Sequence, residues 1–172
     1  MNFKMKTCFY AGYGSNLNIE QMKSRCPKSK LISKSVILDW TLVFRGVADI
    51  ICKKNSKLNI GIYKITEECE KSLDKYEGFP KLYNKKYFKI QLNEKEEDVL
   101  TYVMNPKYSL GPPCERYFKL IVEGFKSWKL DKKFLFDAVS FSINNRSNFT
   151  YKPDHFSESP IINETTALKL LK

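Results

Sequence analysis

The stretch CFYAGYGSNL, residues 8–17, joins an apolar and aromatic run to a group of small, turn-forming residues. Residues 8–13 are apolar enough for a buried central strand. Gly12 and Gly14 allow backbone angles and close approaches that a Cβ atom would prevent. The sequence therefore predicts a buried strand that ends in a loop facing a ligand, with an ordinary strand-to-helix turn as the alternative on this stretch alone.

A helix is expected directly after this loop. Asn18 precedes Gln21 by the spacing of an N-cap residue and its capping-box partner. Backbone N–H groups at the start of a helix and in a tight Gly-Ser-Asn turn lack acceptors within the chain's regular structure. Such groups can bind a carboxylate or a phosphate, so the loop is a candidate anion site.

A second informative stretch is LDKYEGFP, residues 73–80, at the end of another predicted helix. Thr66 is placed to cap that helix, and an acidic first turn follows, where negative charge is favourable. Cys69, Leu73 and Tyr76 recur at helical spacing, so we expect them to form the buried stripe of the helix.

Glu77 lies four residues after Leu73, on the buried side of the same helix, and Gly78 is placed to end it. Burial and the negative end of the helix both favour the protonated carboxyl and raise its pKa toward the range useful for proton transfer near neutral pH. The other interpretation is a structural glutamate bonded to the backbone or to a tyrosine hydroxyl. The residues alone leave both interpretations open.

The remaining pattern predicts a mixed α+β domain. A chain of 172 residues with 42% hydrophobic residues can form one well-buried core. Strands are expected at residues 31–38, 41–44, 47–52, 58–65, 87–92 and 99–104, with a polar hairpin loop at 53–57 and an acidic turn at 93–98. Helices are expected at residues 114–128 and 132–141. Short strands at this spacing indicate a small, mostly antiparallel β-barrel with flanking helices.

The charge of the chain is strongly positive, with a formal net charge of +11. The lysines are scattered along the sequence rather than gathered in one block, which favours a solvated surface over a nucleic-acid-binding face. Diffuse charge of this kind would give at most weak, salt-sensitive association. We therefore expect a small-molecule partner rather than a nucleic acid, and a monomer or a homodimer.

The 5 cysteines are widely spaced without a Cys-x-x-Cys pair, and the chain has 1 histidine. This pattern favours buried, small apolar cysteines over a disulfide framework or a zinc site. No apolar run approaches the roughly 20 residues that span a bilayer. We expect a cytoplasmic protein that needs neither a metal nor a cofactor.

Several short motifs follow one another in a recognisable order. The two longest are Tyr13-Gly14-Ser15-Asn16-Leu17 and the Leu-Asp-x-x-Glu-Gly motif at residues 73–78. Between and after them stand Arg25-Cys26-Pro27, Asp39-Trp40, Ala48-Asp49-Ile50, Gly61-Ile62-Tyr63, Tyr102-Val103, and Pro113 with Tyr117 and Gly124. Together the motifs resemble the gamma-glutamylcyclotransferase-like family, which includes the plant avirulence-induced proteins. We assign residues 1–130 to such a domain and residues 131–172 to an extension packed on it.

The resemblance implies a reaction. Enzymes of this family cleave a γ-glutamyl amide without water, because the substrate's own α-amino group attacks its γ-carbonyl and releases 5-oxoproline and an amine. The reaction requires a folded substrate, support for the oxyanion and a group that moves protons, and it requires no metal. Glu77 matches the family's acid/base position. The identity of the leaving amine stays open.

The resemblance also implies a binding site. The segment Tyr13, Gly14, Ser15, Asn16 and Leu17 would hold the γ-glutamyl unit, with backbone amides on its α-carboxylate. Tyr83 and Tyr117 match family tyrosines that line the pocket. The alternative is a non-catalytic protein that binds a small anionic ligand or nucleotide in the same pocket. A buried carboxylate argues against that alternative, since it gains nothing for binding an anion.

Overall fold

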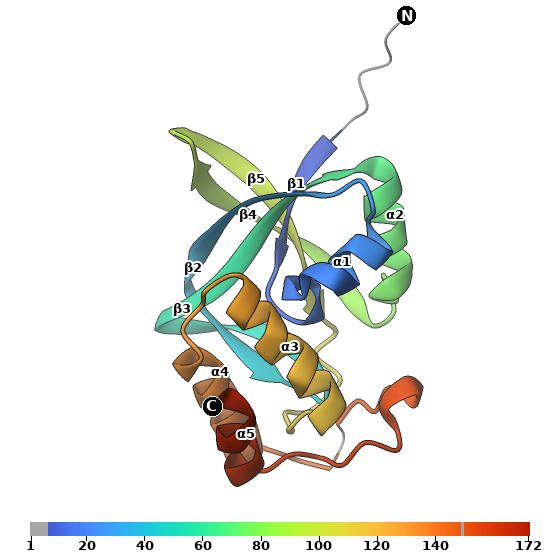
Figure 1. Cartoon of the computed structure of the whole chain (residues 1–172), viewed down its shortest axis with the longest axis vertical. Helices are drawn as coiled ribbons and strands as arrows, with labels where there is room; N and C mark the ends of the chain where they lie inside the picture. The colour runs from blue at the N-terminus through green and yellow to red at the C-terminus, as the bar shows by residue number, and fades with distance from the viewer. Residues whose placement is uncertain (1–6, 149) are drawn as a thin grey trace, which may run out of the picture.

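The sheet of this protein is strongly curled and carries helices around it (Figure 1). The computed structural model describes residues 7–148 and 150–172. These described residues form a sheet of five strands in the order β2-β3-β1-β5-β4. The strands are β1 Thr7–Gly12, β2 Lys30–Phe44, β3 Ala48–Thr66, β4 Tyr83–Leu92 and β5 Lys95–Met104. The helices are α1 Ile19–Arg25, α2 Glu67–Tyr76, α3 Glu115–Ser127, α4 Lys133–Asn144 and α5 Glu164–Leu171, with short 3-10 helices η1 Ser15–Leu17 and η2 Asp154–Phe156.

Strand β1 is the central strand, as its apolar sequence predicts. Its Tyr10 pairs with Tyr63 of β3 in an antiparallel ladder and with Leu100 of β5 in a parallel one. The β2–β3 and β4–β5 pairs are antiparallel. The predicted α+β class and the mostly antiparallel sheet are therefore confirmed.

The sheet is curled but is not a closed barrel, so the predicted barrel is corrected to an open, curled sheet. Strands β2 and β4 form its two edges. Trp40 of β2 and Phe88 of β4 meet edge to face, with ring centroids 5.1 Å apart. The two edges thus approach through side chains, and within residues 7–148 and 150–172 no backbone ladder joins them.

The long β2–β3 hairpin differs from the four short strands expected. The chain turns at residues 45–47. The predicted hairpin loop at residues 53–57 is wrong, because β3 runs through this segment: Cys52 pairs with Trp40 and Lys57 with Leu38, and the residues between them form an irregularity in the ladder. The two expected strands of β2 are likewise one strand, with a register shift between Leu38 and Trp40. Residues 53–55 and 57 are exposed, so the hairpin extends beyond the core there. A strand with polar residues on both faces lacks the alternation of apolar and polar residues, so its sequence resembles that of a loop.

The last forty residues pack onto the same fold. Helix α4 contacts β2, and α5 contacts α4 and α3. Figure 1 shows α4 and α5 together at one end of the molecule, opposite the tips of β4 and β5. Helix α5 is absent from the sequence prediction, although Asn163 caps it by accepting a hydrogen bond from the Thr166 N–H at 2.8 Å.

The predicted apolar stripe of α3 is confirmed, because Tyr117, Ile121, Phe125 and Trp128 are all buried. The cysteines are less uniform: Cys26, Cys69 and Cys114 are buried as expected, whereas Cys52 is exposed. None of the helices in the described part of the chain has the length and apolarity needed to cross a membrane.

Candidate active site

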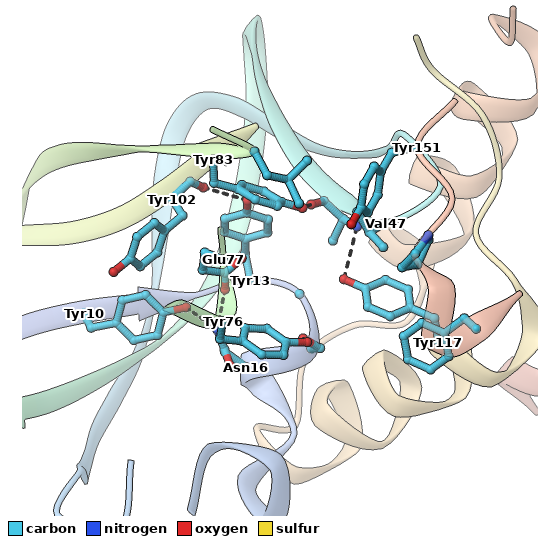
Figure 2. Close-up of a pocket in the computed structure, with 16 residues that line it drawn as sticks. Tyr10, Tyr13, Asn16, Val47, Tyr76, Glu77, Tyr83, Tyr102, Tyr117 and Tyr151 are labelled. Atoms are coloured by element: carbon cyan, nitrogen blue, oxygen red, sulfur yellow. Dashed lines mark hydrogen bonds between the residues drawn. The ribbon is translucent and has the colours of Figure 1, made fainter. Parts of the chain in front are cut away.

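A pocket lies where the loop after β1 meets the end of α2, the start of α3 and the β2–β3 turn (Figure 2). Its lining is dominated by aromatic side chains. The lining residues are Tyr10, Tyr13, Gly14, Ser15, Asn16, Val47, Ala48, Tyr76, Glu77, Leu82, Tyr83, Tyr102, Tyr117, Tyr151, Pro153 and Phe156. The carboxyl group among them belongs to Glu77.

Glu77 is positioned by the way α2 ends. It is the C-cap residue, its N–H donates to the Leu73 carbonyl at 2.8 Å, and Gly78 follows with φ +61. Glycine adopts this left-handed conformation without a Cβ penalty, so the helix stops directly after the carboxylate. The side chain then points into the pocket, as Figure 2 shows.

The Glu77 carboxyl is buried and hydrogen-bonded in the pocket. Its Oε1 accepts a hydrogen bond from Asn16 Nδ2 at 2.9 Å. Burial raises the pKa of Glu77 from 4.5 to about 7, and the Arg25 charge and the Asn16 hydrogen bond lower it in part. A group with this pKa can both take and return a proton near neutral pH.

Hydrogen bonds hold both the side chain and the backbone carbonyl of Asn16. Its Nδ2 also donates to the Tyr10 hydroxyl at 2.7 Å, and its Oδ1 accepts from Arg25 at 2.6 Å. Its backbone carbonyl accepts from the Tyr63 hydroxyl at 2.9 Å. The residue is 3% exposed. These bonds hold the amide that faces Glu77 in one orientation.

The turn before Asn16 presents backbone donors. In the described part of the chain we find no hydrogen bond from the backbone N–H groups of Ser15 and Asn16. A Cβ on Gly14 would lie 2.8 Å from Ala48 Cβ, so only glycine lets the turn approach β3 this closely. The turn can therefore receive an anionic group at the floor of the pocket.

Ala48 holds two tyrosines of the wall through its backbone. Its N–H donates to the Tyr117 hydroxyl at 3.1 Å, and its carbonyl accepts from Tyr83 at 2.5 Å. The Tyr13 hydroxyl donates to the Tyr102 carbonyl at 2.6 Å. The hydroxyls of Tyr13 and Tyr83 thus donate to backbone carbonyls. The Tyr117 hydroxyl accepts from the Ala48 N–H, so its own O–H remains available to donate. Burial raises the pKa of all three phenols, so they are neutral.

The structure brings most of the sequence-predicted site residues together. Those that line the pocket with Glu77 are Tyr13, Gly14, Ser15, Asn16, Tyr83 and Tyr117. Leu17 is a correction, because it is fully buried under α3 and outside the pocket lining. Its carbonyl accepts from Trp128 Nε1 at 2.9 Å, and a Cβ on Gly124 would lie 2.7 Å from its Cβ. Leu17 anchors the turn to the core.

Sequence reasoning missed residues that act on the site from its edge. Tyr76, expected in the buried stripe of α2, is 38% exposed. The Arg25 guanidinium lies 3.5 Å from the centre of its ring, and Ser15 Oγ lies 3.2 Å from its hydroxyl. Two features of the sequence could have indicated these residues. Arg25 belongs to the Arg-Cys-Pro motif, and Tyr76 directly precedes Glu77.

The C-terminal extension contributes a wall. Tyr151, Pro153 and Phe156 line the pocket, and the Tyr151 N–H donates to the Arg45 carbonyl at 3.1 Å. Gly46, with φ +85, lies directly beneath this segment. Residues 150–156, which we call the wall segment, therefore contribute to the pocket from the C-terminal extension.

Substitution of Gly46 by alanine should release the wall segment. A Cβ there would lie 1.9 Å from the Tyr151 carbonyl oxygen, and the positive φ adds a cost of about 1 kcal/mol. We expect tryptic cleavage at Lys152 to increase by on the order of tenfold in Gly46→Ala. Gly78→Ala is the matched control, since it carries a similar φ cost away from the segment. Equal cleavage of the wild type and Gly46→Ala would contradict this role of Gly46.

Comparisons with known proteins identify the family and the fold. The family model for gamma-glutamyl cyclotransferase, AIG2-like, matches residues 10–120. A search of curated protein sequences finds none that matches this chain significantly.

Solved structures share the fold. A structure named gamma-glutamyl cyclotransferase has a TM-score of 0.69 at 22% identity, over 89% of this chain and 97% of its own. The uncharacterized protein loc79017 from Homo sapiens has a TM-score of 0.67 at 22% identity, over 88% and 96%. YkqA from Bacillus subtilis has a TM-score of 0.64 at 19% identity, over 81% of this chain and 55% of its own. From the match over residues 10–120, the chain belongs to the gamma-glutamyl cyclotransferase, AIG2-like family.

Proposed function

We propose that this protein is a γ-glutamyl cyclotransferase that converts a γ-glutamyl amide into 5-oxoproline and a free amine, with Glu77 as the acid/base. The observation that carries the proposal is the Glu77 carboxyl in the pocket, hydrogen-bonded to Asn16, with its pKa raised by burial to about 7. Family membership supports this reaction class.

In the proposed reaction Glu77 moves the protons. The ionised carboxylate takes one proton from the substrate's α-ammonium group, and the amine attacks the γ-carbonyl carbon. A new C–N bond closes the ring, and the bond to the leaving nitrogen then breaks. Glu77 returns its proton to that nitrogen. The ring nitrogen loses a second proton, which leaves with the released amine.

The rest of the pocket would hold the substrate folded for this attack. The backbone N–H groups of Ser15 and Asn16 are placed to bind the α-carboxylate. The Tyr117 hydroxyl can donate to the developing oxyanion or to the carbonyl that precedes it. Bringing the amine and the carbonyl together inside the pocket would supply a large part of the rate enhancement.

Loss of the Tyr117 hydroxyl should slow the reaction without stopping it. In Tyr117→Phe the pocket keeps its ring but loses a donor, and the Ala48 N–H loses its acceptor. We expect kcat/KM to fall by about 10- to 100-fold, a smaller loss than that of a complete oxyanion hole. Tyr83→Phe is the matched control, because the Tyr83 proton is already used on the Ala48 carbonyl. A Tyr117→Phe enzyme no slower than Tyr83→Phe would contradict the donor role.

The proposed function is tested by product analysis. The purified protein is incubated with γ-glutamyl dipeptides, γ-glutamyl amines and ε-linked γ-glutamyl-lysine, and products are identified by mass spectrometry. We expect 5-oxoproline with at least one substrate, which also identifies the leaving amine. Free glutamate in its place would show hydrolysis, and no product from the folded protein would favour a small-molecule binding protein with the same pocket.

A further inference from the structure

Arg25 lies beside the candidate active site. At the end of α1 its Nη1 donates to Asn16 Oδ1 at 2.6 Å and to Ser15 Oγ at 3.2 Å. Its Nη2 donates to Gln21 Oε1 at 2.9 Å. The guanidinium stacks on the ring of Tyr76. Arg25 is thus held by four side chains of the loop, α1 and α2.

All these acceptors are neutral. In the described residues Arg25 forms no ion pair, so no adjacent carboxylate neutralises its charge. The half-buried cation therefore acts on the carboxylate behind Asn16, which is Glu77. A positive charge at this range stabilises the ionised carboxyl.

Arg25 also determines which end of Asn16 faces Glu77. A guanidinium donates hydrogen bonds and accepts none, so the Asn16 carboxamide must turn its oxygen toward Arg25. Its nitrogen then faces away, and donates to Glu77 and Tyr10. The two hydrogen bonds in series, from Arg25 to Asn16 and from Asn16 to Glu77, therefore point in the same direction and polarise one another.

We propose that Arg25 is a positioning residue of this site: it fixes the Asn16 carboxamide so that its N–H donates to Glu77, and its charge keeps Glu77 ionised as a proton acceptor near neutral pH. The kinetic consequences rest on the proposed function, whereas the effect on the Glu77 carboxyl does not. Arg25 donates a hydrogen bond to Asn16 rather than to Glu77, and it takes no proton itself.

The other groups around Glu77 cannot replace this charge. They are the phenols Tyr10 and Tyr13 before α1, Tyr76 of α2, Tyr83 of β4, Tyr102 of β5, Tyr117 of α3 and Tyr151 of the wall segment. Burial raises the pKa of each of them, so all are neutral. Asp49 of β3 acts on Tyr13 and is paired with Arg45 at 2.7 Å.

The first test is the pH profile of kcat/KM for 5-oxoproline formation. In Arg25→Gln the charge is lost, the pKa of Glu77 rises, and a larger fraction of the enzyme carries protonated Glu77 at pH 7. We expect the acid limb to move up by about one pH unit, with an approximately fivefold loss at pH 7 that is largely recovered at pH 9. A uniform loss across the pH range would show a merely structural role and overturn the proposal.

Two further variants separate charge from geometry. Arg25→Lys keeps the charge but not the planar fork, so we expect a smaller shift of the acid limb than in Arg25→Gln. Lys23→Gln removes one positive charge from the same helix, where Lys23 pairs with exposed Glu20. Its acid limb should coincide with that of the wild type. A shift in Lys23→Gln as large as in Arg25→Gln would show a general charge effect and overturn the proposal.

A second readout needs no substrate. The Glu77 carboxyl is titrated by carbon-13 NMR in protein labelled at glutamate, with its resonance assigned from Glu77→Gln. We expect a higher pKa in Arg25→Gln than in the wild type, and an unchanged pKa overturns the proposal. If the titration shifts but the wild type forms no 5-oxoproline, the positioning role holds and the proposed function fails. Should Arg25→Gln not fold, the same comparison is made with Arg25→Met, which also removes the charge.

Discussion

Glu77→Gln should form 5-oxoproline at least on the order of 10³-fold more slowly than the wild type, because the glutamine can neither take nor return a proton. The change is nearly isosteric, and the Asn16 carboxamide keeps a neighbour that can accept its hydrogen bond. It also removes a buried ionisable group. We therefore expect the loss in kcat, with a thermal unfolding midpoint at least as high as that of the wild type.

The measurement compares initial rates and substrate binding in the same preparation. Calorimetric titration of Glu77→Gln with the substrate should give a dissociation constant close to the KM of the wild type, since binding contacts remain. Glu20→Gln, an exposed substitution on α1, is the control for charge. Turnover by Glu77→Gln within about tenfold of the wild type would exclude Glu77 as the acid/base.

Asp49→Ala should lower the free energy of unfolding by about 3–5 kcal/mol. Asp49 is 1% exposed, and it accepts from Arg45 Nε at 2.7 Å and from the Met104 N–H at 2.8 Å. Burial raises the pKa of Asp49 despite Arg45, so the ion pair itself is weakly favourable. The cost of Asp49→Ala arises because the half-buried Arg45 and the Met104 N–H lose their acceptor.

The same substitution should loosen the pocket, because the neighbouring Ala48 binds Tyr83 and Tyr117 through its backbone. Urea unfolding measures the stability loss. Asp98→Ala is the matched control, since Asp98 pairs with Lys89 on the sheet at about 60% exposure. That variant should change stability by less than about 1 kcal/mol. Similar losses in the two variants would contradict the role assigned to Asp49.

Local signals predicted the elements that frame the site. Asn18 caps α1 by accepting from the Gln21 N–H, and Thr66 caps α2 by accepting from the Cys69 N–H. Gly78 ends α2 directly after Glu77. Each signal acts between residues three or four positions apart, so the sequence contains all that is needed to find it.

The features that the sequence analysis did not predict depend on contacts between residues far apart in the sequence. Strand β3 continues through residues 53–57 because the segments on either side pair with β2, while the polar residues between them carry no strand periodicity. The wall segment reaches the pocket because Gly46 leaves space for it, and no local sequence pattern predicts this contact between distant residues. Arg25 likewise meets Tyr76 only after α1 and α2 pack together.

The central claim is tested most directly by following 5-oxoproline and the released amine together in the wild type and in Glu77→Gln, with one γ-glutamyl substrate at pH 7. The account predicts equimolar 5-oxoproline and amine from the wild type, no free glutamate, and no product above background from Glu77→Gln while that variant remains folded. Equal product from both proteins, or glutamate in place of 5-oxoproline, would contradict cyclisation driven by Glu77.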